Sequence, residues 1–155
     1  MHGFTIPPVT PITASIEISR PPQDVFDYVA DLKRQTEWQA SLVDVELETE
    51  GPTRVGTRAV DTRKVPMGGK QKFPFEITEH DPPNRTSFAV TGGPVRPHGT
   101  VTFTPLEGGK RTRVDFTMEF VRHGIGKLLV PLANRDARKM VPADLAALKQ
   151  RLESG

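Results

Sequence analysis

The sequence predicts an α+β domain in which a curved antiparallel sheet of seven strands wraps around one long C-terminal helix. Three observations predict this fold class. An alternating strand pattern near the start is followed by two short helical segments. Strand patterns separated by short turns fill the middle of the chain. Apolar residues at helical spacing then occupy the chain from about residue 126 onward.

The first predicted strand covers residues 13–19, where apolar and polar residues alternate. It ends before Pro21 and Pro22, because proline cannot donate to a strand ladder and suits the first turn of a helix. Asp31 is expected to cap a second short helix that ends near Trp38. The apolar residues of this helical stretch are Val25, Phe26, Val29 and Leu32.

Six further strands are predicted between residues 42 and 122, because five turn signals rich in Gly, Pro, Asn and Asp divide this stretch. The turns fall at residues 50–52, 66–69, 81–84, 92–94 and 107–109. Strands joined by short turns pair as antiparallel neighbours, so a meander is expected. Pro74 cannot donate a ladder bond, which predicts that its strand is an edge or is bulged there.

Alternation within these strands assigns one apolar face to the interior. The residues on this face are Phe73, Phe75, Ile77, Phe88, Val90, Val101, Phe103, Val114, Phe116, Met118 and Phe120. The strand at residues 57–64 has no clear apolar face, so its register stays open. Either Asp61 and Arg63 point inward as a polar pair, or Arg58 and Val60 do.

The C-terminal helix presents an apolar stripe formed by Ala133, Ala137, Val141, Leu145, Leu148 and Leu152. Pro142 interrupts the pattern and predicts a kink or break near Arg138. Several small residues also lie along the helix, namely Ala133, Ala137, Ala143, Ala146 and Ala147. Small side chains that face the phenylalanines of the sheet leave an apolar space, and such a space binds apolar guests. We therefore expect a cavity between the sheet and the helix.

Short motifs follow one another in a distinctive order: Ile16-Glu17-Ile18, Pro21-Pro22, Val25-Phe26, Val29-Ala30-Asp31-Leu32, Glu37-Trp38, Val55-Gly56-Thr57 and residues 76–83, 99–105 and 108–112. In this order the chain resembles the START-related helix-grip (SRPBCC) superfamily, in its polyketide cyclase/dehydrase and lipid-transport branch, over residues 12–153. The resemblance implies a helix-grip fold. The resemblance does not indicate one particular function, because the superfamily includes lipid carriers, hormone receptors, aromatase/cyclases, co-chaperones and stress proteins. Pro142 and the Pro-rich N-terminal residues depart from the family pattern, which puts the shape of the cavity mouth in question.

Composition bounds the class of protein further. A length of 155 residues suits one domain. We expect a flexible N-terminal arm over residues 1–11 and a single ligand-binding domain over residues 12–155. Twenty-one basic and nineteen acidic residues give a net charge of +2, which is not a nucleic-acid footprint. No apolar run approaches the ~18 residues of a membrane span, and no signal-peptide pattern opens the chain. A cytoplasmic protein without integral membrane contact is expected.

The sequence carries no strong catalytic spacing. There is no Cys, and the four histidines, His2, His80, His98 and His123, lack metal-binding spacing, so neither a metal nor a cofactor is expected. Weak catalytic candidates that would polarise a carbonyl group are Arg63, His123 and Asn134. Whether the chain is an enzyme stays open.

The favoured hypothesis is that the chain binds or carries a small hydrophobic molecule, lipid-like or polyketide-like. The residues expected to contact it are Trp38, Asp61, Phe73, Phe75, Phe88, Val90, Val101, Phe103, Phe116, Met118, Phe120, Ala137 and Val141. A first alternative is a polyketide cyclase or dehydratase that acts in the same cavity. A second is a protein that docks a partner through the apolar mouth. The oligomeric state, monomer or homodimer, stays open.

Overall fold

The computed structural model describes residues 11–66, 68–121 and 129–154. The predicted N-terminal arm lies almost wholly outside these residues. The elements in chain order are β1 (Ile12–Ile18), α1 (Pro22–Ala30), η1 (Leu32–Glu37), β2 (Leu42–Leu47), β3 (Arg58–Lys64), β4 (Lys70–Asp81), β5 (Arg85–Val90), β6 (Arg96–Leu106), η2 (Glu107–Gly109), β7 (Arg111–Val121) and α2 (Val130–Ser154). None of the helices in these described ranges is long and apolar enough to cross a membrane.

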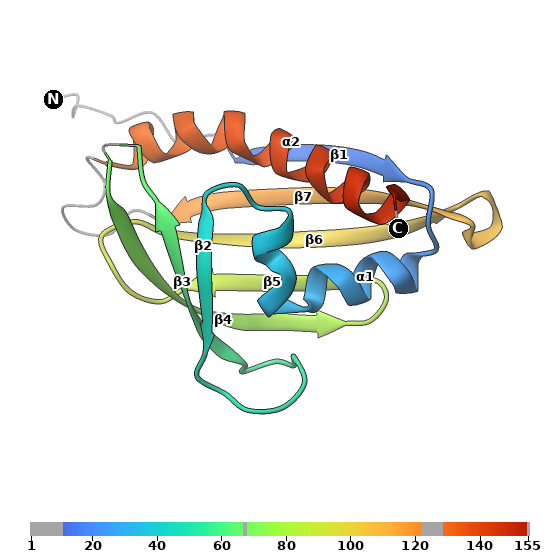
Figure 1. The fold of residues 1–155 in the computed structure, drawn as a ribbon, viewed down its shortest axis with the longest axis horizontal. Coiled ribbons are helices and arrows are strands. Elements are labelled where there is room, and N and C mark those ends of the chain that lie inside the picture. The colour runs from blue at the N-terminus through green and yellow to red at the C-terminus, as the bar shows by residue number, and fades with distance from the viewer. Residues whose placement is uncertain (1–10, 67, 122–128, 155) are drawn as a thin grey trace, which may run out of the picture.

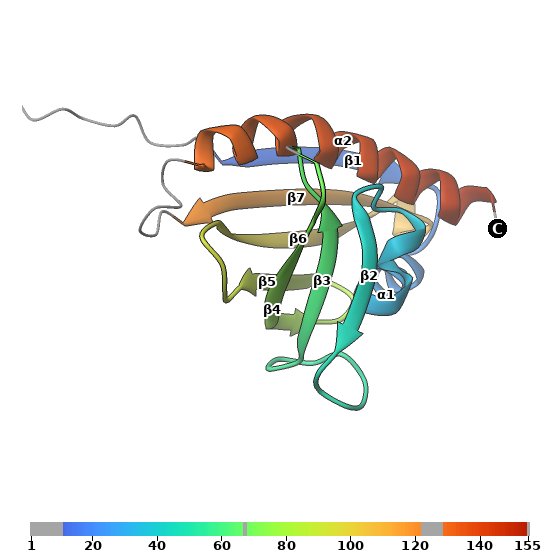
Figure 2. The same cartoon turned by 60° about the vertical axis from the view of Figure 1, so that its left-hand side comes forward.

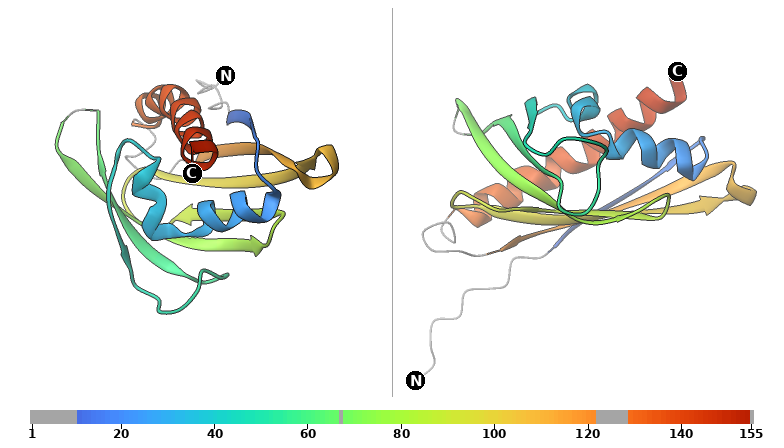
Figure 3. Two further views of the ribbon diagram at one scale, coloured as in Figure 1. Left: turned by 45° about the vertical axis from the view of Figure 1, so that its right-hand side comes forward. Right: turned by 90° about the horizontal axis from the view of Figure 1, so that it is seen from below.

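The seven strands form one antiparallel sheet in the order β1-β7-β6-β5-β4-β3-β2 (Figure 1). The stretch from β2 to β7 is the predicted meander, and β1 joins its far edge by pairing with β7, where Ile16 lies opposite Val114. The sheet is strongly curved, since β2 and β3 run steeply across the direction of β6 and β7 in Figure 2. α2 lies across the concave side of this sheet (Figures 2 and 3). The predicted α+β helix-grip fold is therefore confirmed.

Two short helices follow β1, as the sequence predicts. Pro22 begins α1, whose buried side chains include Val25, Phe26 and Val29. Asp31 then precedes η1, a 3₁₀ helix, but its side chain makes no capping hydrogen bond. The backbone carbonyl of Asp31 instead accepts a hydrogen bond from the Arg34 amide at 3.0 Å. The predicted second helix is thus present with Asp31 at its N-cap, although the cap is made by the backbone and not by the side chain.

The core is divided into clusters on the concave face of the sheet. One cluster joins α1, the β6–β7 pair and the C-terminal part of α2, and it contains Phe26, Phe103 and Leu148. A second cluster joins η1 to β2, β3 and β4 through Leu32, Ala59 and other buried residues. A third links β1 and β7 to the middle of α2. The alternation in the strands therefore assigned the interior face correctly.

α2 corrects two expectations. The helix runs unbroken through Pro142, so the predicted break near Arg138 is wrong, while the alternative of a kink stays a prediction; the axis bends along its length in Figure 1. Pro142 is exposed, so water can satisfy the Arg138 carbonyl that loses its helical partner, while Val141 and Leu145 are buried against the rest of the fold. Ala143 and Ala146 also face solvent, so they leave no space inside the protein.

Pro74 corrects a third expectation. Its strand, β4, lies between β3 and β5 rather than at an edge of the sheet. The register is regular at Pro74, and the irregularity falls between Ile77 and Glu79. The Pro74 carbonyl accepts a hydrogen bond from the Thr91 amide at 2.8 Å, just beyond the end of β5. In an antiparallel strand the N–H and C=O of one residue point toward the same neighbouring strand. The position of the missing Pro74 N–H therefore faces the chain just after β5 has ended, so no ladder hydrogen bond is lost within β5.

One glycine permits the close approach of two neighbouring strands. Gly99 of β6 lies opposite Phe88 of β5. A Cβ atom placed on Gly99 would lie 2.7 Å from Phe88 Cε1 and 3.1 Å from the backbone oxygen of Thr117. Both separations are shorter than ordinary contacts, so only glycine lets the Phe88 ring lie over β6.

We expect Gly99→Ala to destabilise the protein by about 1–3 kcal/mol, because the added methyl group overpacks this contact. The free energy of unfolding in urea measures the effect. In a Phe88→Leu background the same substitution should cost less, which a double-mutant cycle detects. A stabilising effect of Gly99→Ala, as expected for an unobstructed strand position, would contradict this explanation.

Candidate functional site

A cavity of about 420 Å³ lies between the concave face of the sheet and α2. Its sheet side includes Phe73 and Phe75 from β4, Phe88 from β5, and Phe116 and Phe120 from β7. Its helix side is formed by Ala137, Met140, Val141 and other residues on the inner face of α2. The cavity exists because α2 presents the small side chain of Ala137, 2% exposed, to a wall of large aromatic rings.

Most residues that the sequence singles out for ligand contact line this cavity. They are Trp38, Asp61, Phe73, Phe75, Phe88, Val90, Val101, Phe116, Met118, Phe120, Ala137 and Val141. Phe103 does not line it. Its ring lies 5.2 Å from the Phe26 ring in an edge-to-face contact, because β6 carries it toward the end of the sheet that α1 covers.

The structure resolves which face of β3 points inward. Ala59 is fully buried and Asp61 is 7% exposed, whereas Arg58 is exposed. Asp61 lies opposite Val45 on β2 and Phe73 on β4, so these strands hold it in the wall of the cavity. Of the two registers left open, the one with Asp61 and Arg63 inward is correct.

A cluster of polar side chains surrounds Arg63 at this wall. Arg63 Nη2 donates to Asp61 Oδ2 at 2.9 Å and to Gln39 Oε1 at 2.6 Å, while Nη1 donates to Ser41 Oγ at 3.1 Å. From α2, Asp144 Oδ1 accepts a hydrogen bond from the Ala40 amide at 3.2 Å. We call Gln39, Ser41, Asp61, Arg63 and Asp144 the polar cluster, and all five line the cavity.

Burial sets the proton affinity of the two acids in the polar cluster. Desolvation raises the pKa of the Asp61 carboxyl above its ordinary value, and the charge and hydrogen bond of Arg63 offset only part of that rise. Desolvation likewise raises the pKa of Asp144, opposed by the Ala40 amide and by the charge of Arg63. The Arg63 charge and these hydrogen bonds therefore do not fully compensate for removing the two carboxylates from water.

Sequence reasoning missed three members of the polar cluster. Gln39 and Ser41 sit in the connection after η1 and carry no periodic signal. Asp144 had a signal, because it lies three residues after Val141 and one before Leu145, within the apolar stripe of α2. A charged residue inside an apolar stripe is a sequence sign of a polar interior site.

The other two catalytic candidates fall elsewhere. His123 lies outside the described residues. Asn134, in the first half of α2, is 5% exposed but is not among the residues that line the cavity. Arg63 is therefore the catalytic candidate that the described structure brings to the cavity wall.

The cavity opens to solvent near the N-terminal end of α2. Leu129 and Leu132 line it, although they are 44% and 41% exposed. Pro66, after β3, and Pro94, after β5, also line it and are exposed.

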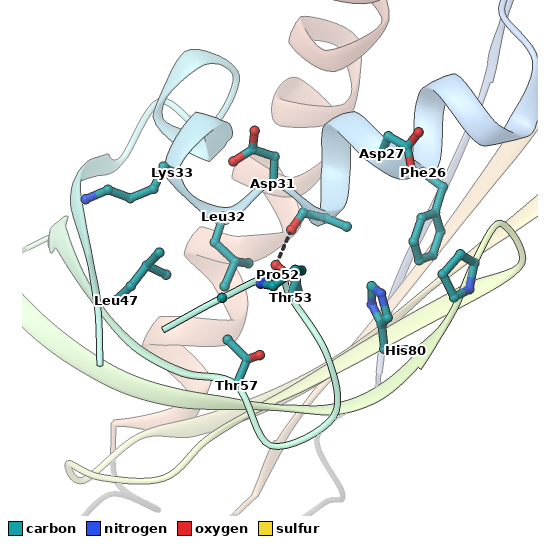
Figure 4. Close-up of a pocket in the computed structure, with 13 residues that line it drawn as sticks. Phe26, Asp27, Asp31, Leu32, Lys33, Leu47, Pro52, Thr53, Thr57 and His80 are labelled. Atoms are coloured by element: carbon teal, nitrogen blue, oxygen red, sulfur yellow. Dashed lines mark hydrogen bonds between the residues drawn. The ribbon is translucent and has the colours of Figure 1, made fainter. Parts of the chain in front are cut away.

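A second hollow of about 360 Å³ lies between α1, η1, the loop after β2 and the end of β4 (Figure 4), and it shares Ala30, Leu32 and Thr53 with the lining of the cavity. Its rim carries Asp27, Asp31 and Lys33, and Thr53 Oγ1 donates to the Ala30 carbonyl at 2.9 Å. Charges of both signs lie on an exposed rim, so this surface selects no single kind of ligand. Within the described ranges, no group of acidic, His or Cys side chains is arranged to hold a metal ion.

The sequence pattern of one protein family, described as "Polyketide cyclase / dehydrase and lipid transport", matches residues 10–153. The chain belongs to this family. The predicted superfamily resemblance is thereby confirmed, and the curved sheet around α2 is the family's architecture in this chain. No curated protein matches the sequence.

Solved structures share this family fold. TTHA0849 from Thermus thermophilus is 26% identical, with a TM-score of 0.76, over 94% of this chain and 98% of that one. The di-domain ARO/CYC BexL from the BE-7585A biosynthetic pathway is 21% identical, with a TM-score of 0.72, over 93% of this chain and 46% of BexL. The di-domain ARO/CYC StfQ from the steffimycin pathway is 18% identical, with a TM-score of 0.66, over 92% of this chain and 46% of StfQ. The likenesses to BexL and StfQ show the fold alone.

We expect the stability advantage of Asp61→Asn over the wild type to grow as pH rises. The folded state holds the Asp61 proton more tightly than the unfolded state, whose ordinary pKa is 3.8. Above that value the folded wild type binds more protons than the unfolded chain, so its free energy of unfolding falls with pH until the raised pKa is passed. Asparagine does not titrate. Urea unfolding of both proteins from pH 3 to pH 7 measures the difference, and a difference that shrinks with rising pH would contradict the assignment.

Proposed function

We propose that the chain binds a small hydrophobic molecule in the cavity between the sheet and α2. The cavity itself carries the proposal, because about 420 Å³ lies within the ~300–1,000 Å³ typical of small-molecule sites. Its walls are mainly phenylalanine, valine and other apolar side chains, with the polar cluster on one side. Membership of a family that includes lipid transport supports a guest of lipid-like or polyketide-like character.

Apolar burial alone gives weak binding. A guest that buries roughly 300 Å² of apolar surface gains ~7 kcal/mol at about 25 cal/mol per Å². Association costs at least ~4 kcal/mol, which leaves a millimolar affinity. Tighter binding therefore requires hydrogen bonds from the polar cluster or from Trp38.

Ala137→Phe tests the cavity directly. The added ring projects from the buried face of α2 into the space that a guest would fill. We expect the affinity for the neutral apolar dye N-phenyl-1-naphthylamine to fall at least about tenfold, as measured by dye fluorescence. Native mass spectrometry of the wild type as purified should also show a bound small molecule that Ala137→Phe lacks.

Ala146→Phe is the matched control, because Ala146 lies on the solvent face of the same helix. It should leave dye affinity within about twofold of the wild type. Equal dye affinity in Ala137→Phe and the wild type would rule out this cavity as the binding site.

A second candidate function is that of an enzyme that cyclises or dehydrates a polyketide-like chain in the same cavity. The observation that favours it is the Asp61–Arg63 ion pair at the cavity wall, in which Asp61 is buried and Arg63 is partly buried. Three of the five N–H donors of Arg63 are used within the polar cluster, so donors remain for a substrate carbonyl. The fold likeness to the ARO/CYC proteins BexL and StfQ is consistent with this chemistry. The cavity would act by holding the chain in a folded, water-excluded shape.

Arg63→Ala separates the two functions. If the chain only binds its guest, the variant should keep dye affinity within about tenfold, and neither protein should convert a synthetic poly-β-ketone into aromatic products. If it is an enzyme, the wild type should form cyclised product and Arg63→Ala should form none at equal dye affinity. Product formation followed by chromatography decides between them.

A further inference from the structure

Exposed apolar side chains lie together at the opening of the cavity. Leu129 and Leu132 are 44% and 41% exposed, and both line the cavity. Pro66 and Pro94 are also exposed and also line it. We call these four residues the apolar rim. Single exposed apolar residues are ordinary on a protein surface, but a group of them beside an apolar cavity indicates a surface that binds something.

Basic residues are concentrated around the apolar rim. The β3–β4 hairpin (residues 64–66 and 68–70), the turn after β5 (residues 91–96) and the start of α2 (residues 129–140) lie at one end of the molecule in Figures 1 and 3. These segments carry one acidic residue, Asp136, and six basic residues, which are Lys64, Lys70, Arg96, Arg135, Arg138 and Lys139. The other fifteen basic and eighteen acidic residues of the chain give a net charge of −3. The positive charge of the protein therefore lies at the cavity opening.

The six basic side chains are available to a partner. None of them forms an ion pair with another residue in the described part of the chain. All are exposed except Arg96, which is half-buried and donates from Nε to the Gly93 carbonyl at 2.9 Å. Unpaired cations on one surface produce a positive potential that attracts an anionic surface.

The start of α2 combines the apolar and the basic features on one face. Residues three, four and seven positions apart lie on the same side of a helix. Arg135 and Lys139 therefore share a face with Leu132, as does Asp136. A helix face that joins leucine to basic residues suits the surface of an anionic bilayer, because apolar side chains enter the acyl boundary while basic ones contact lipid phosphates.

A bilayer fits this surface better than a folded protein does. The apolar rim borders an opening rather than a closed surface. A protein docked there would have to fill the opening to reach the packing density of an ordinary interface. Acyl chains are fluid, so they fill an irregular apolar opening, and a hydrophobic guest is already concentrated among them.

We propose that the cavity opening docks onto the surface of an anionic lipid bilayer. The apolar rim lies against the acyl boundary, and the six basic residues lie against the lipid phosphates. This inference rests on the proposed binding function and adds the place where the guest is exchanged. A lipid-like guest then passes between bilayer and cavity without exposing its apolar surface to water, which would be unfavourable.

Sedimentation with vesicles tests the proposal. The purified full chain is mixed at ~0.1 M salt with vesicles of phosphatidylcholine, either alone or with about one third phosphatidylglycerol. We expect binding to the anionic vesicles to be at least about tenfold tighter, because several basic residues face one surface. Raising the salt to ~0.5 M should remove most of this difference, because salt screens the attraction between exposed charges.

A pair of charge reversals locates the docking surface. Arg135→Glu combined with Lys139→Glu should weaken binding to the anionic vesicles at least about tenfold. The matched control is Arg58→Glu combined with Lys110→Glu, which changes the net charge equally at exposed residues outside the three segments. The control should change vesicle affinity by about threefold or less. Both double variants should keep their affinity for N-phenyl-1-naphthylamine within about threefold of the wild type, since none of the four residues lines the cavity.

Leu132→Ser tests the apolar rim. It removes an apolar side chain from the docking surface, so binding to the anionic vesicles should weaken at least about threefold. Leu47→Ser is the matched control, because Leu47 is also 41% exposed but lies on β2, outside the three segments. It should leave vesicle binding unchanged.

Failure of docking can be told apart from failure of guest binding. If the anionic vesicles bind no more tightly than the neutral ones while the dye binds, docking is overturned and the proposed function stands. If poly-L-glutamate binds as tightly as the anionic vesicles and Leu132→Ser behaves like the wild type, the surface recognises an acidic protein and the proposal is overturned. If the wild type does not bind the dye, the proposed function fails, and guest exchange at a bilayer fails with it. The two vesicle compositions are compared on the wild type, so the result does not depend on the folding of a variant.

Discussion

The attachment of α2 to the sheet is the contact on which both the fold and the cavity depend. Near its C-terminal end, Leu145 and Leu148 are buried with Val114 and Phe26. Hydrogen bonds reinforce the same end: the Ser19 amide donates to Glu153 Oε2 at 2.8 Å, and Arg20 Nε, Lys149 Nζ and Arg151 Nε donate to backbone carbonyls. The N-terminal half of α2 packs fewer large apolar side chains against the sheet. Its inward-facing residue 137 is an alanine rather than a leucine, and the Leu132 side chain is 41% exposed. The C-terminal end of α2 is therefore packed firmly against the sheet, whereas its N-terminal half lies over the cavity.

The polar cluster beside the cavity lowers the stability of the fold. Asp61 and Asp144 are buried and Arg63 is partly buried, and the raised pKa values of the two acids show that their interactions do not fully offset the loss of water. Apolar residues of similar size would stabilise the interior at least as well. Polar groups that lower stability and face a cavity are typical of sites that recognise a ligand. Their hydrogen bonds link the connection after η1 to β3 and to α2.

Family membership and cavity chemistry answer different questions about this protein. The family pattern over residues 10–153 and the likeness to TTHA0849 establish the architecture. They leave binding and catalysis equally open, because one curved sheet around one helix supports many activities. What distinguishes binding from catalysis is local: how many N–H donors of Arg63 the polar cluster leaves unused, and which charged side chains lie beside that residue. A carrier needs only the apolar walls, whereas an enzyme also needs Arg63 to act on a bound carbonyl.

By itself the sequence determined the order of elements and the interior face of most strands. Residues such as Phe75, Val101 and Met118 alternate with polar neighbours, and an alternating pattern has one favourable orientation against a core. The sequence could not orient β3, because Thr57 to Lys64 lacks that contrast. The pairing of Ala59 with Phe75 on β4 decided it, and this brought Asp61 and Arg63 into the cavity. Nor could it place Trp38, Asp61 and Asp144 together, since contacts between residues so far apart in the chain depend on how the sheet bends around α2. Alternation is a local pattern that is visible in the sequence itself. The polar cluster, in contrast, forms only because the curved sheet brings three separate segments to the same wall of the cavity.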